Sequence, residues 1–257
     1  VPLVIVEGFF SSAGALVWGN IHEHSNHLVR ADGREDRRVI FSRVGPVSSL
    51  HDRACELFYS LVGGVVDYGE EHARSHEHRR FGRTHGTGLY PQWSKDNPLH
   101  FLGHSLGGPT ILKLQWLLEN GFFGVRYHPE MILSANTISS PFRGTQLVYH
   151  AGEDPAKAPA VQWFSLGYML ARWVYLLAYL APILPAALDM HTESRCLTFN
   201  EVSILTLLWY LWKCEWAEAE DAAPFDATFQ AAHRREVQRE GAINPGTYYR
   251  SYVACIV

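Results

Sequence analysis

The pattern most directly able to do chemistry is Gly103-His104-Ser105-Leu106-Gly107. It follows a short apolar run, Leu99–Leu102, and precedes a stretch with helical spacing, Pro109–Glu119. In a strand–turn–helix context the pattern G-x-S-x-G holds serine in a strained conformation, so the residues two before and two after must be small. Ser105 is therefore the candidate nucleophile. The alternative is a glycine-rich connection in an ordinary α/β protein.

A nucleophilic serine also needs hydrogen-bond donors for the oxyanion that forms when an ester carbonyl is attacked. The backbone N–H of Leu106, at the start of the following helix, is one candidate. The amide of Phe9 is the second, because the segment Glu7-Gly8-Phe9-Phe10 follows an early apolar strand. A carboxylate beside an oxyanion is unfavourable, so Glu7 must be paired or turned away if this site is active.

The serine further requires a base and an acid, expected in the chain order serine, carboxylate, histidine. Four histidines follow Ser105: His128, His150, His191 and His233. Only Asp226 with His233 keeps the expected order near the end of the chain, and neither follows a predicted strand. Order without geometry is weak support, so this pair is not favoured as the partners of Ser105.

Histidines are concentrated ahead of the serine, ten of the fourteen preceding Ser105. The segment Val66–Gly88 is rich in His, Arg and Gly. It is either a solvated loop or a metal-binding segment, because loosely spaced histidines bind metal only in some proteins. Helical spacing alone favours His72 with His76 as a pair over His72 with His78.

The elements that would position these residues alternate along the chain, which predicts a parallel sheet covered by helices on both faces. The Val66–Gly88 segment is expected to be a loop with one helical turn. The predicted strands are Val1–Val6, Val39–Val44, Leu99–Leu102, Met131–Ala135 and Thr247–Val257, and the predicted helices include His51–Val65 and Pro109–Glu119.

A long apolar run, Val161–Pro185, has the length of a membrane span, which takes about 20 residues. Arg172 near its middle would cost about 2.5–3.5 kcal/mol in a bilayer, and prolines interrupt its end. A lid or surface helix with a wide apolar face is therefore favoured, and no stable membrane span is expected. A second apolar run, Ser203–Trp212, is predicted to pack beside it.

Bulk composition fits one large domain of 257 residues with a buried core. The net charge of −4 gives no electrostatic case for a nucleic-acid partner. The four cysteines are widely spaced and are expected to be buried thiols. The chain begins at Val1, as in a mature secreted chain or an internal fragment; secretion is expected, with a cytoplasmic location as the alternative.

Several longer motifs together resemble the zinc-containing thermoalkalophilic bacterial lipases, a family of α/β-hydrolases. The match is dense from Val44 to Val148 and looser across the apolar runs. The motifs are VGPVSSLHDRACE (44–56), LVGGVVDYGEEHARSHEHRRFGRT (61–84), GHSLGG (103–108), LLENG (117–121), TISSPFRGTQLV (137–148), WAEAEDAAPFDAT (216–228) and NPGTYY (244–249).

This resemblance implies an α/β-hydrolase fold with a structural zinc ion held by Asp52, His72, His78 and Asp221. Two imidazoles and two carboxylates form a closed tetrahedral set, which suits zinc without an open position for catalysis. The resemblance places the zinc insertion at about 48–90 and the lid at about 150–215 of a single domain, 1–257. It also implies that the triad acid and base lie beyond Thr247–Val257, so the chain is expected to be a fragment.

Three functions follow as hypotheses. The first is a lipase or carboxylesterase that cleaves acylglycerol esters at an oil–water interface through an acyl-enzyme on Ser105. The second is a non-catalytic, zinc-stabilised relative that binds lipid or a partner, favoured by Glu7 and the missing triad members. The third, a membrane-anchored protein, would use Val161–Pro185 as a span.

Overall fold

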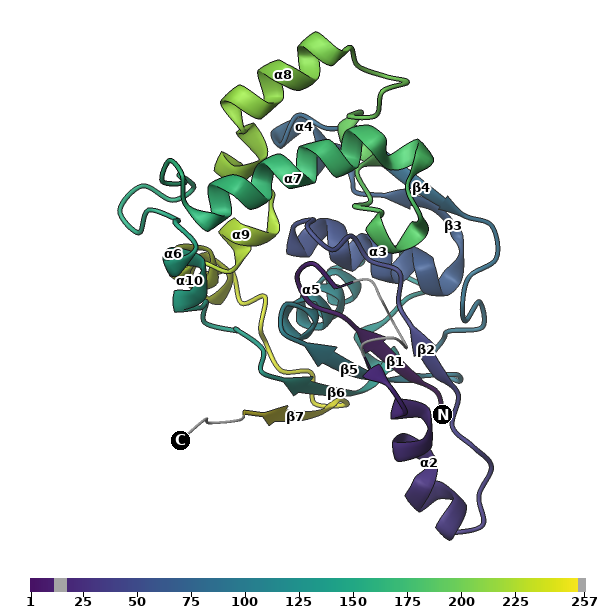
Figure 1. Ribbon diagram of the computed structural model, residues 1–257. Helices are drawn as coiled ribbons and strands as arrows, with labels where there is room; N and C mark the ends of the chain where they lie inside the picture. Colours follow the sequence, from purple (N-terminus) through teal and green to yellow (C-terminus); the bar gives the residue numbers. More distant parts are fainter. Residues whose placement is uncertain (12–17, 254–257) are drawn as a thin grey trace.

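A five-stranded parallel sheet forms the centre of the computed structural model, which describes residues 1–11 and 18–253 (Figure 1). All neighbouring strands in the order β2-β1-β5-β6-β7 run parallel, as the sequence predicts. The end of the predicted strand Thr247–Val257 beyond Val253 lies outside the described residues. The strands are β1 (Leu3–Val6), β2 (Val39–Phe41), β5 (Leu99–His104), β6 (Ile132–Ile138) and β7 (Tyr248–Tyr252).

Two helices, α3 (Leu50–Val62) and α5 (Gly107–Glu119), pack together against this sheet. Their buried faces join the apolar residues of β1 and β5 in the main core. Arg53 of α3 is fully buried and donates to Thr110 Oγ1 (3.0 Å), to Gly45 O (2.6 Å) and to the backbone carbonyl of Glu7. This guanidinium therefore ties α3 to α5 and to the loop that follows β1.

The histidine-rich segment contains a two-stranded antiparallel sheet, which the sequence does not predict. Strands β3 (Gly64–Asp67) and β4 (Phe81–His85) flank helix α4 (Glu70–Ser75). The expectation of a loop with one helical turn was therefore wrong for both strands. Neither strand has clean apolar alternation, and the pairing is supported by cross-strand contacts such as Arg80 with Asp67 (2.8 Å).

Two apolar helices, α7 (Leu166–Leu180) and α8 (Ile204–Lys213), form a layer on the far side of α3 from the sheet (Figure 1). They pack against each other, as predicted, and the rings of Tyr175 and Tyr210 stack at 5.5 Å. The stretch Leu166–Ile183 is long and apolar enough to cross a membrane, and only 22% of it is buried.

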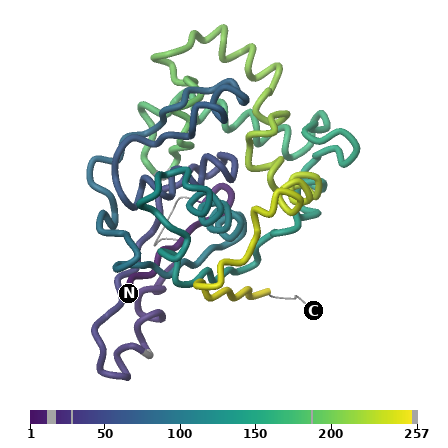
Figure 2. The backbone as a smooth tube through the Cα atoms, turned by 180° about the vertical axis from the view of Figure 1, so that it is seen from behind, coloured from purple at the N-terminus to yellow at the C-terminus, as the bar shows by residue number. Residues whose placement is uncertain are grey.

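Shorter helices complete the described chain. Figure 2 shows the last of them and the chain leading to β7 running beside the α5 region, where Lys113 pairs with Glu240 at 2.5 Å. Helix α2 stands apart near the N-terminus and was not predicted. These helices are α2 (Ile21–Ala31), α6 (Gln146–His150), α9 (Ala223–Asp226) and α10 (Phe229–Val237); 3₁₀ turns lie at Pro129–Met131, Ala181–Ile183, Ala186–Leu188, Glu193–Arg195 and Glu215–Glu218.

Candidate active site and metal centre

Ser105 occupies the turn between β5 and α5 with a backbone φ of +52°, in the left-handed region that non-glycine residues rarely adopt. The two glycines of the motif leave room for this turn. A Cβ on Gly103 would lie 2.5 Å from Gly108 N, and one on Gly107 would overlap the carbonyl oxygen of Val6. The predicted strained serine turn is therefore present, and its glycines are sterically required.

The loop after β1 lies directly against this serine. A Cβ on Gly8 would stand 2.7 Å from Ser105 Cβ, so only glycine permits the approach. In the described part of the chain the backbone amides of Phe9 and Leu106 donate no hydrogen bond, and both residues line the cavity at Ser105. Both residues predicted as oxyanion donors therefore line the same cavity as Ser105.

Glu7, the unusual residue of that loop, is buried and engaged by its neighbours. Its Oε1 accepts hydrogen bonds from Ser11 Oγ (3.0 Å) and from Trp18 Nε1 (3.2 Å). Its backbone carbonyl accepts from Arg53, whose buried positive charge lies close by. Pairing of this kind meets the condition that the sequence set for Glu7 in a working oxyanion site.

An apolar cavity of about 360 Å³ opens at Ser105. Its walls come from the serine turn, from α6 and α7, and from the α9 region. Glu153 lies among these walls, where burial raises the pKa of its carboxyl to about 6. Sequence reasoning missed this residue, since no local pattern marks it. The apolar lining includes Leu147, Val148, Val161, Leu166, Leu170, Trp216, Ala223 and Pro224.

No described side chain forms a hydrogen bond with Ser105 Oγ. The one pair that keeps the triad order is also not a relay: Asp226 accepts from Leu50 N (2.7 Å) and pairs with Arg235 (2.9 Å). His233 is exposed. The expectation that Asp226 and His233 do not serve the serine agrees with these contacts.

The four residues implied as metal ligands converge, although they come from distant parts of the chain. Each offers one ligand atom, and these atoms all lie within 4.8 Å of one another. Asp52 sits in the first turn of α3, where Ser49 accepts from its backbone N–H, and His72 lies on α4. His78 follows α4, and Asp221 precedes α9.

The distances between the polar atoms of this cluster suit a shared metal ion better than direct hydrogen bonds between the side chains. His72 Nε2, His78 Nε2 and Asp52 Oδ1 are buried and have no hydrogen-bond partner. His72 Nε2 lies 3.2 Å from an oxygen of each aspartate, and His78 Nε2 lies 3.4 Å from Asp221 Oδ2. A tetrahedral ion with bonds of about 2.0–2.1 Å spaces its ligand atoms about 3.3–3.4 Å apart.

The electrostatics of the cluster without a cation support the same conclusion. Burial, reinforced by the charge of Asp221, raises the pKa of Asp52 to about 7. Burial, together with the charge of Arg195, lowers the pKa of His78 to about 4. Burial also disfavours protonated His72, but the two aspartates outweigh it and raise its pKa to about 9. A bound dication would stabilise both carboxylates and both neutral imidazoles at once.

Neighbouring groups orient the side chains of this cluster. His78 Nδ1 faces Arg79 O at 2.8 Å, which turns Nε2 toward the cluster. The ring of His51 stacks on that of His72 with centroids 3.7 Å apart, and His51 Nε2 lies 2.8 Å from Tyr68 O. Arg195 pairs with Asp221 Oδ2 and lies 3.7 Å from Asp52 Oδ2. Sequence reasoning missed Arg195, which lies outside the quoted motifs.

Two other histidines of the segment stand outside the ligand group. The ring of His76 is 4.6 Å from that of His72 and belongs to no described metal cluster. The helical spacing that favoured His72 with His76 was therefore misleading, because α4 ends at Ser75 and the chain then turns back to bring in His78. His85 is buried on β4.

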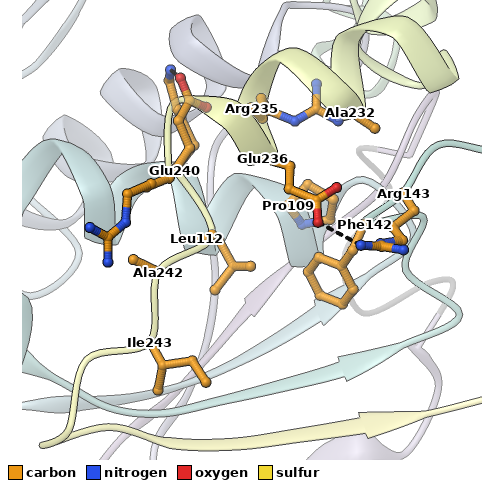
Figure 3. Close-up of a pocket in the computed structure, with 13 residues that line it drawn as sticks. Pro109, Leu112, Phe142, Arg143, Ala232, Arg235, Glu236, Glu240, Ala242 and Ile243 are labelled. Atoms are coloured by element: carbon orange, nitrogen blue, oxygen red, sulfur yellow. Dashed lines mark hydrogen bonds and ion pairs between the residues drawn. The ribbon is translucent and has the colours of Figure 1, made fainter.

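A larger cavity, of about 650 Å³, lies between α5 and α10 and does not include Ser105 (Figure 3). Its rim carries opposite charges that pair with one another, such as Arg143 with Glu236 at 2.5 Å. Its floor is apolar, with Leu112, Phe142 and Ile243. The smaller cavity therefore remains the candidate ester site.

Comparison with known proteins supports the resemblance seen in the motifs. The chain is 27% identical to the lipase of Staphylococcus hyicus over 98% of its own length and to lipase 1 of Staphylococcus aureus over the same share. It spans only about 40% of the length of these curated relatives.

Solved structures agree with the sequence relatives. The crystal structure of S. hyicus lipase matches with a TM-score of 0.73 and 26% identity, covering 96% of this chain and 65% of that one. EstA from Clostridium botulinum matches with a TM-score of 0.65 and 29% identity, covering 96% of this chain and 58% of that one. The predicted α/β-hydrolase fold and the resemblance to bacterial lipases are confirmed.

A family model described as "Lipase-like, C-terminal domain" matches residues 1–146, more than half of the chain. The strained serine turn and three of the four clustered metal-site residues fall within this region. The chain belongs to the family of lipase-like C-terminal domains.

Proposed function

We propose that the chain carries the ester-cleaving site of a lipase or carboxylesterase, with Ser105 as its nucleophile. The observation that carries this proposal is the placement of Ser105, held at a φ of +52° at the mouth of an apolar cavity of about 360 Å³. A strained serine beside two available amides is the arrangement that acyl transfer requires.

In the proposed reaction Ser105 Oγ attacks the ester carbonyl and the amides of Phe9 and Leu106 stabilise the oxyanion. Collapse of this intermediate expels the alcohol and leaves an acyl-serine, which water then hydrolyses. The acyl chain lies in the cavity between α6, α7 and α9. We propose acylglycerols or other lipid esters as the substrate class, because few polar groups interrupt this lining.

We further propose that the proton acceptor for Ser105 lies outside the described residues. No described side chain bonds to Ser105 Oγ, and the lipases that the chain resembles are longer than the region matched. Loss of a triad base costs about 10⁶ in kcat in a well-studied hydrolase, with about 10³–10⁴ over water remaining.

Ester hydrolysis tests this proposal. The 257-residue chain is expected to hydrolyse a short p-nitrophenyl ester only slowly, and Ser105→Ala is expected to remove even that rate. The full-length gene product is expected to hydrolyse the same ester at ordinary enzymatic rates. Fast, Ser105-dependent hydrolysis by the 257-residue chain alone would show that a described residue is the base.

The metal is proposed to be zinc in a structural role. Asp52, His72, His78 and Asp221 would hold it, and their two imidazoles and two carboxylates leave no open position for substrate. Bound there, the ion would join α3, α4 and the segment before α9.

Secretion of the whole protein is likewise proposed. The protein's presence in the culture medium or in the cell fraction would decide it.

A second candidate function is a non-catalytic, zinc-stabilised protein that binds lipid. The missing base for Ser105 among the described residues favours it. This alternative predicts lipid binding by the full-length gene product without ester hydrolysis.

A further inference from the structure

Glu153 is a buried carboxyl that the proposed reaction does not use. It lies in the loop between α6 and α7, and only 3% of its surface is exposed. Among the described residues that line the cavity at Ser105, it is the single Asp or Glu. Acidic side chains are rarely buried in such surroundings, and a few placed polar groups in an apolar cavity usually serve to orient a ligand.

Closure of the loop does not require an acid. Glu153 Oε1 accepts a hydrogen bond from Ala160 N–H at 3.0 Å, beside the bridge that pairs Glu153 with Val161. The amide oxygen of a glutamine would accept the same bond with no charge to bury. Burial raises the pKa of Glu153 to about 6, and the charges of Asp154 and Glu218 reinforce this shift. Loop closure therefore does not explain why this position holds a carboxyl.

The second oxygen of this carboxyl has no partner in the described ranges 1–11 and 18–253, because the one hydrogen bond to the Glu153 side chain ends on Oε1. Oε2 is also not one of the unpartnered side-chain atoms that the fold encloses completely. Part of its surface therefore stays open, and Glu153 belongs to the wall of the cavity. A carboxylate oxygen placed in this way can accept a hydrogen bond from a donor that enters the cavity.

The number of donors decides which group fits this oxygen. Thr145 caps α6 by accepting from Leu147 N at 3.2 Å, and His150 is exposed, so Glu153 Oε2 is the buried free acceptor of the wall. A hydroxyl brings one donor. An ammonium brings three, and two of them would be left unpaired against apolar side chains. The lining therefore favours a hydroxyl over an amine.

We propose that Glu153 is a specificity-determining residue, which accepts a hydrogen bond through Oε2 from a free hydroxyl of the bound ester. The inference rests on the proposed function, because it names a preferred substrate class of the same site. The hydroxyl belongs either to the acyl chain or to a glycerol with unesterified positions, and both present the same donor. An ester without a hydroxyl leaves the buried carboxylate unpaired, which costs affinity.

Ligand binding tests this assignment without hydrolysis. The full-length gene product with Ser105→Ala is titrated with methyl decanoate and with methyl hydroxydecanoates that carry the hydroxyl at successive carbons. Monodecanoylglycerol supplies the glycerol arm. We expect a hydroxyl-bearing ester of at least one arm to bind about tenfold or more tightly than methyl decanoate, and that arm identifies the source of the hydroxyl. Equal affinities in both arms would overturn the proposal.

Variants tie the preference to Glu153. The reference ligand is the methyl ether of the preferred hydroxyl, which keeps an acceptor and removes the donor. The Ser105→Ala parent is expected to prefer the hydroxyl to the ether by about tenfold. In Glu153→Gln the amide oxygen keeps Ala160 N–H and the amide nitrogen faces the cavity, where it donates to both ligands, so the preference is expected to disappear.

Asp154→Asn is the matched control, because it removes a neighbouring negative charge that does not line the cavity. It is expected to keep the full preference, and unchanged circular dichroism would establish that both variants are folded. A preference that survives in Glu153→Gln, or that falls equally in Asp154→Asn, would overturn the contact. A methyl aminodecanoate that binds more tightly than its hydroxy counterpart would overturn the choice of a hydroxyl.

Failure of the proposed function would be distinguishable from failure of this inference. Binding is measured without the Ser105 hydroxyl, so a Glu153-dependent preference in a protein that hydrolyses no ester would leave the recognition in place and remove only the enzymatic role. Ester hydrolysis by the protein with its native Ser105, without any preference for a hydroxyl, would do the reverse.

Discussion

Ser105 keeps its left-handed φ of +52° because the surrounding backbone leaves no room for another path. Gly8 abuts its Cβ, and Gly107 lies against the carbonyl of Val6. The strain therefore comes from the close approach of β1 and β5, which are adjacent and in parallel register. Backbone strain of this size costs about 1–3 kcal/mol and persists only where packing enforces it.

The buried carboxyl of the single residue Glu153 predicts how the stability of the protein changes with pH. Burial raises its carboxyl pKa from 4.5 to about 6, so the folded protein retains a proton there that the unfolded chain has lost. The protonated carboxyl therefore makes its full contribution to the free energy of unfolding below pH 4.5, and this contribution is lost as pH rises through about 6. Glu153→Gln keeps an acceptor for Ala160 N–H and is expected to raise Tm by about 2–4 °C at pH 7.5, with little change at pH 4.5.

Thermal unfolding at the two pH values measures this effect. Glu35→Gln, at an exposed site, is the control and is expected to leave Tm unchanged at both. A Glu153→Gln variant that is stabilised equally at pH 4.5 and 7.5 would show that ionisation of this carboxyl is not the cause.

Residues within motifs could be predicted, whereas residues that act through distant contacts could not. The serine turn and the positions of Phe9 and Leu106 at its cavity follow from local spacing, and the four clustered side chains that could hold a metal follow from the family motifs. Arg195 meets Asp221 across 26 positions of sequence, and Glu153 becomes unusual only because the folded chain buries it. No local pattern encodes such contacts.

At the scale of elements, one arginine fastens the β3–β4 hairpin to the segment that returns from α7. Arg83 on β4 pairs with Asp189 (2.6 Å) and Glu193 and donates to His191 Nε2 (3.0 Å). His191 Nδ1 in turn lies 3.0 Å from the buried Glu56 of α3. The position of this returning segment therefore depends on the hairpin as well as on α7.

Removal of this arginine should loosen the returning segment selectively. Arg83→Leu is expected to speed amide hydrogen exchange across 189–195 by about tenfold or more, because it leaves the carboxylates of Asp189 and Glu193 without their cation. Arg80→Leu is the matched control, since Arg80 pairs within the hairpin, with Asp67. Equal effects of the two variants on 189–195 would contradict the proposed fastening.

The contrast between local sequence patterns and distant contacts also explains which elements could be predicted. All five strands of the central sheet were predicted, and the buried strand β1 shows the continuous apolar run that parallel strands often have. The edge strand β7, with the sequence YYRSY, is mostly exposed and has no such run. The β3–β4 hairpin was missed, because its strands contain Gly, Asp, Arg and His and gain support from Arg80 and Tyr68. Pairing that depends on side-chain contacts between strands leaves little periodicity in the sequence.

At the scale of the whole molecule, the cluster that could hold a metal brings together segments that are far apart in the sequence. Its side chains come from α3, from α4 and the turn after it, and from the segment before α9. Asp52 and Asp221 are both buried, and the charge of Asp221 helps to raise the pKa of Asp52 even though Arg195 lies against both carboxylates, so a cation bound between them would relieve their repulsion. Occupancy of the site should therefore control the stability of the entire fold.

Asp52→Asn tests this role because its effect on the stability of the protein is expected to differ between the zinc-bound and the metal-free state. With zinc present, the variant is expected to bind less than one ion per chain and to melt at a lower temperature than the parent, since an amide is a poorer ligand than a carboxylate. After removal of metal by a chelator, it is expected to be at least as stable as the parent, because one buried negative charge is gone.

Elemental analysis and thermal unfolding provide both measurements. Asp67→Asn is the control, because Asp67 pairs with Arg80 and is not a ligand. A parent protein with no zinc after expression in zinc-containing medium would refute the structural metal, as would a parent Tm that does not respond to chelation.

Covalent labelling of Ser105 tests the central claim most directly. The full-length gene product is treated with a fluorophosphonate, which reacts with activated serines, and the labelled peptide is identified by mass spectrometry. We expect one adduct on Ser105, lost in Ser105→Ala. A folded protein with no adduct, or with an adduct on another residue that persists in Ser105→Ala, would contradict the assignment of Ser105 as the nucleophile.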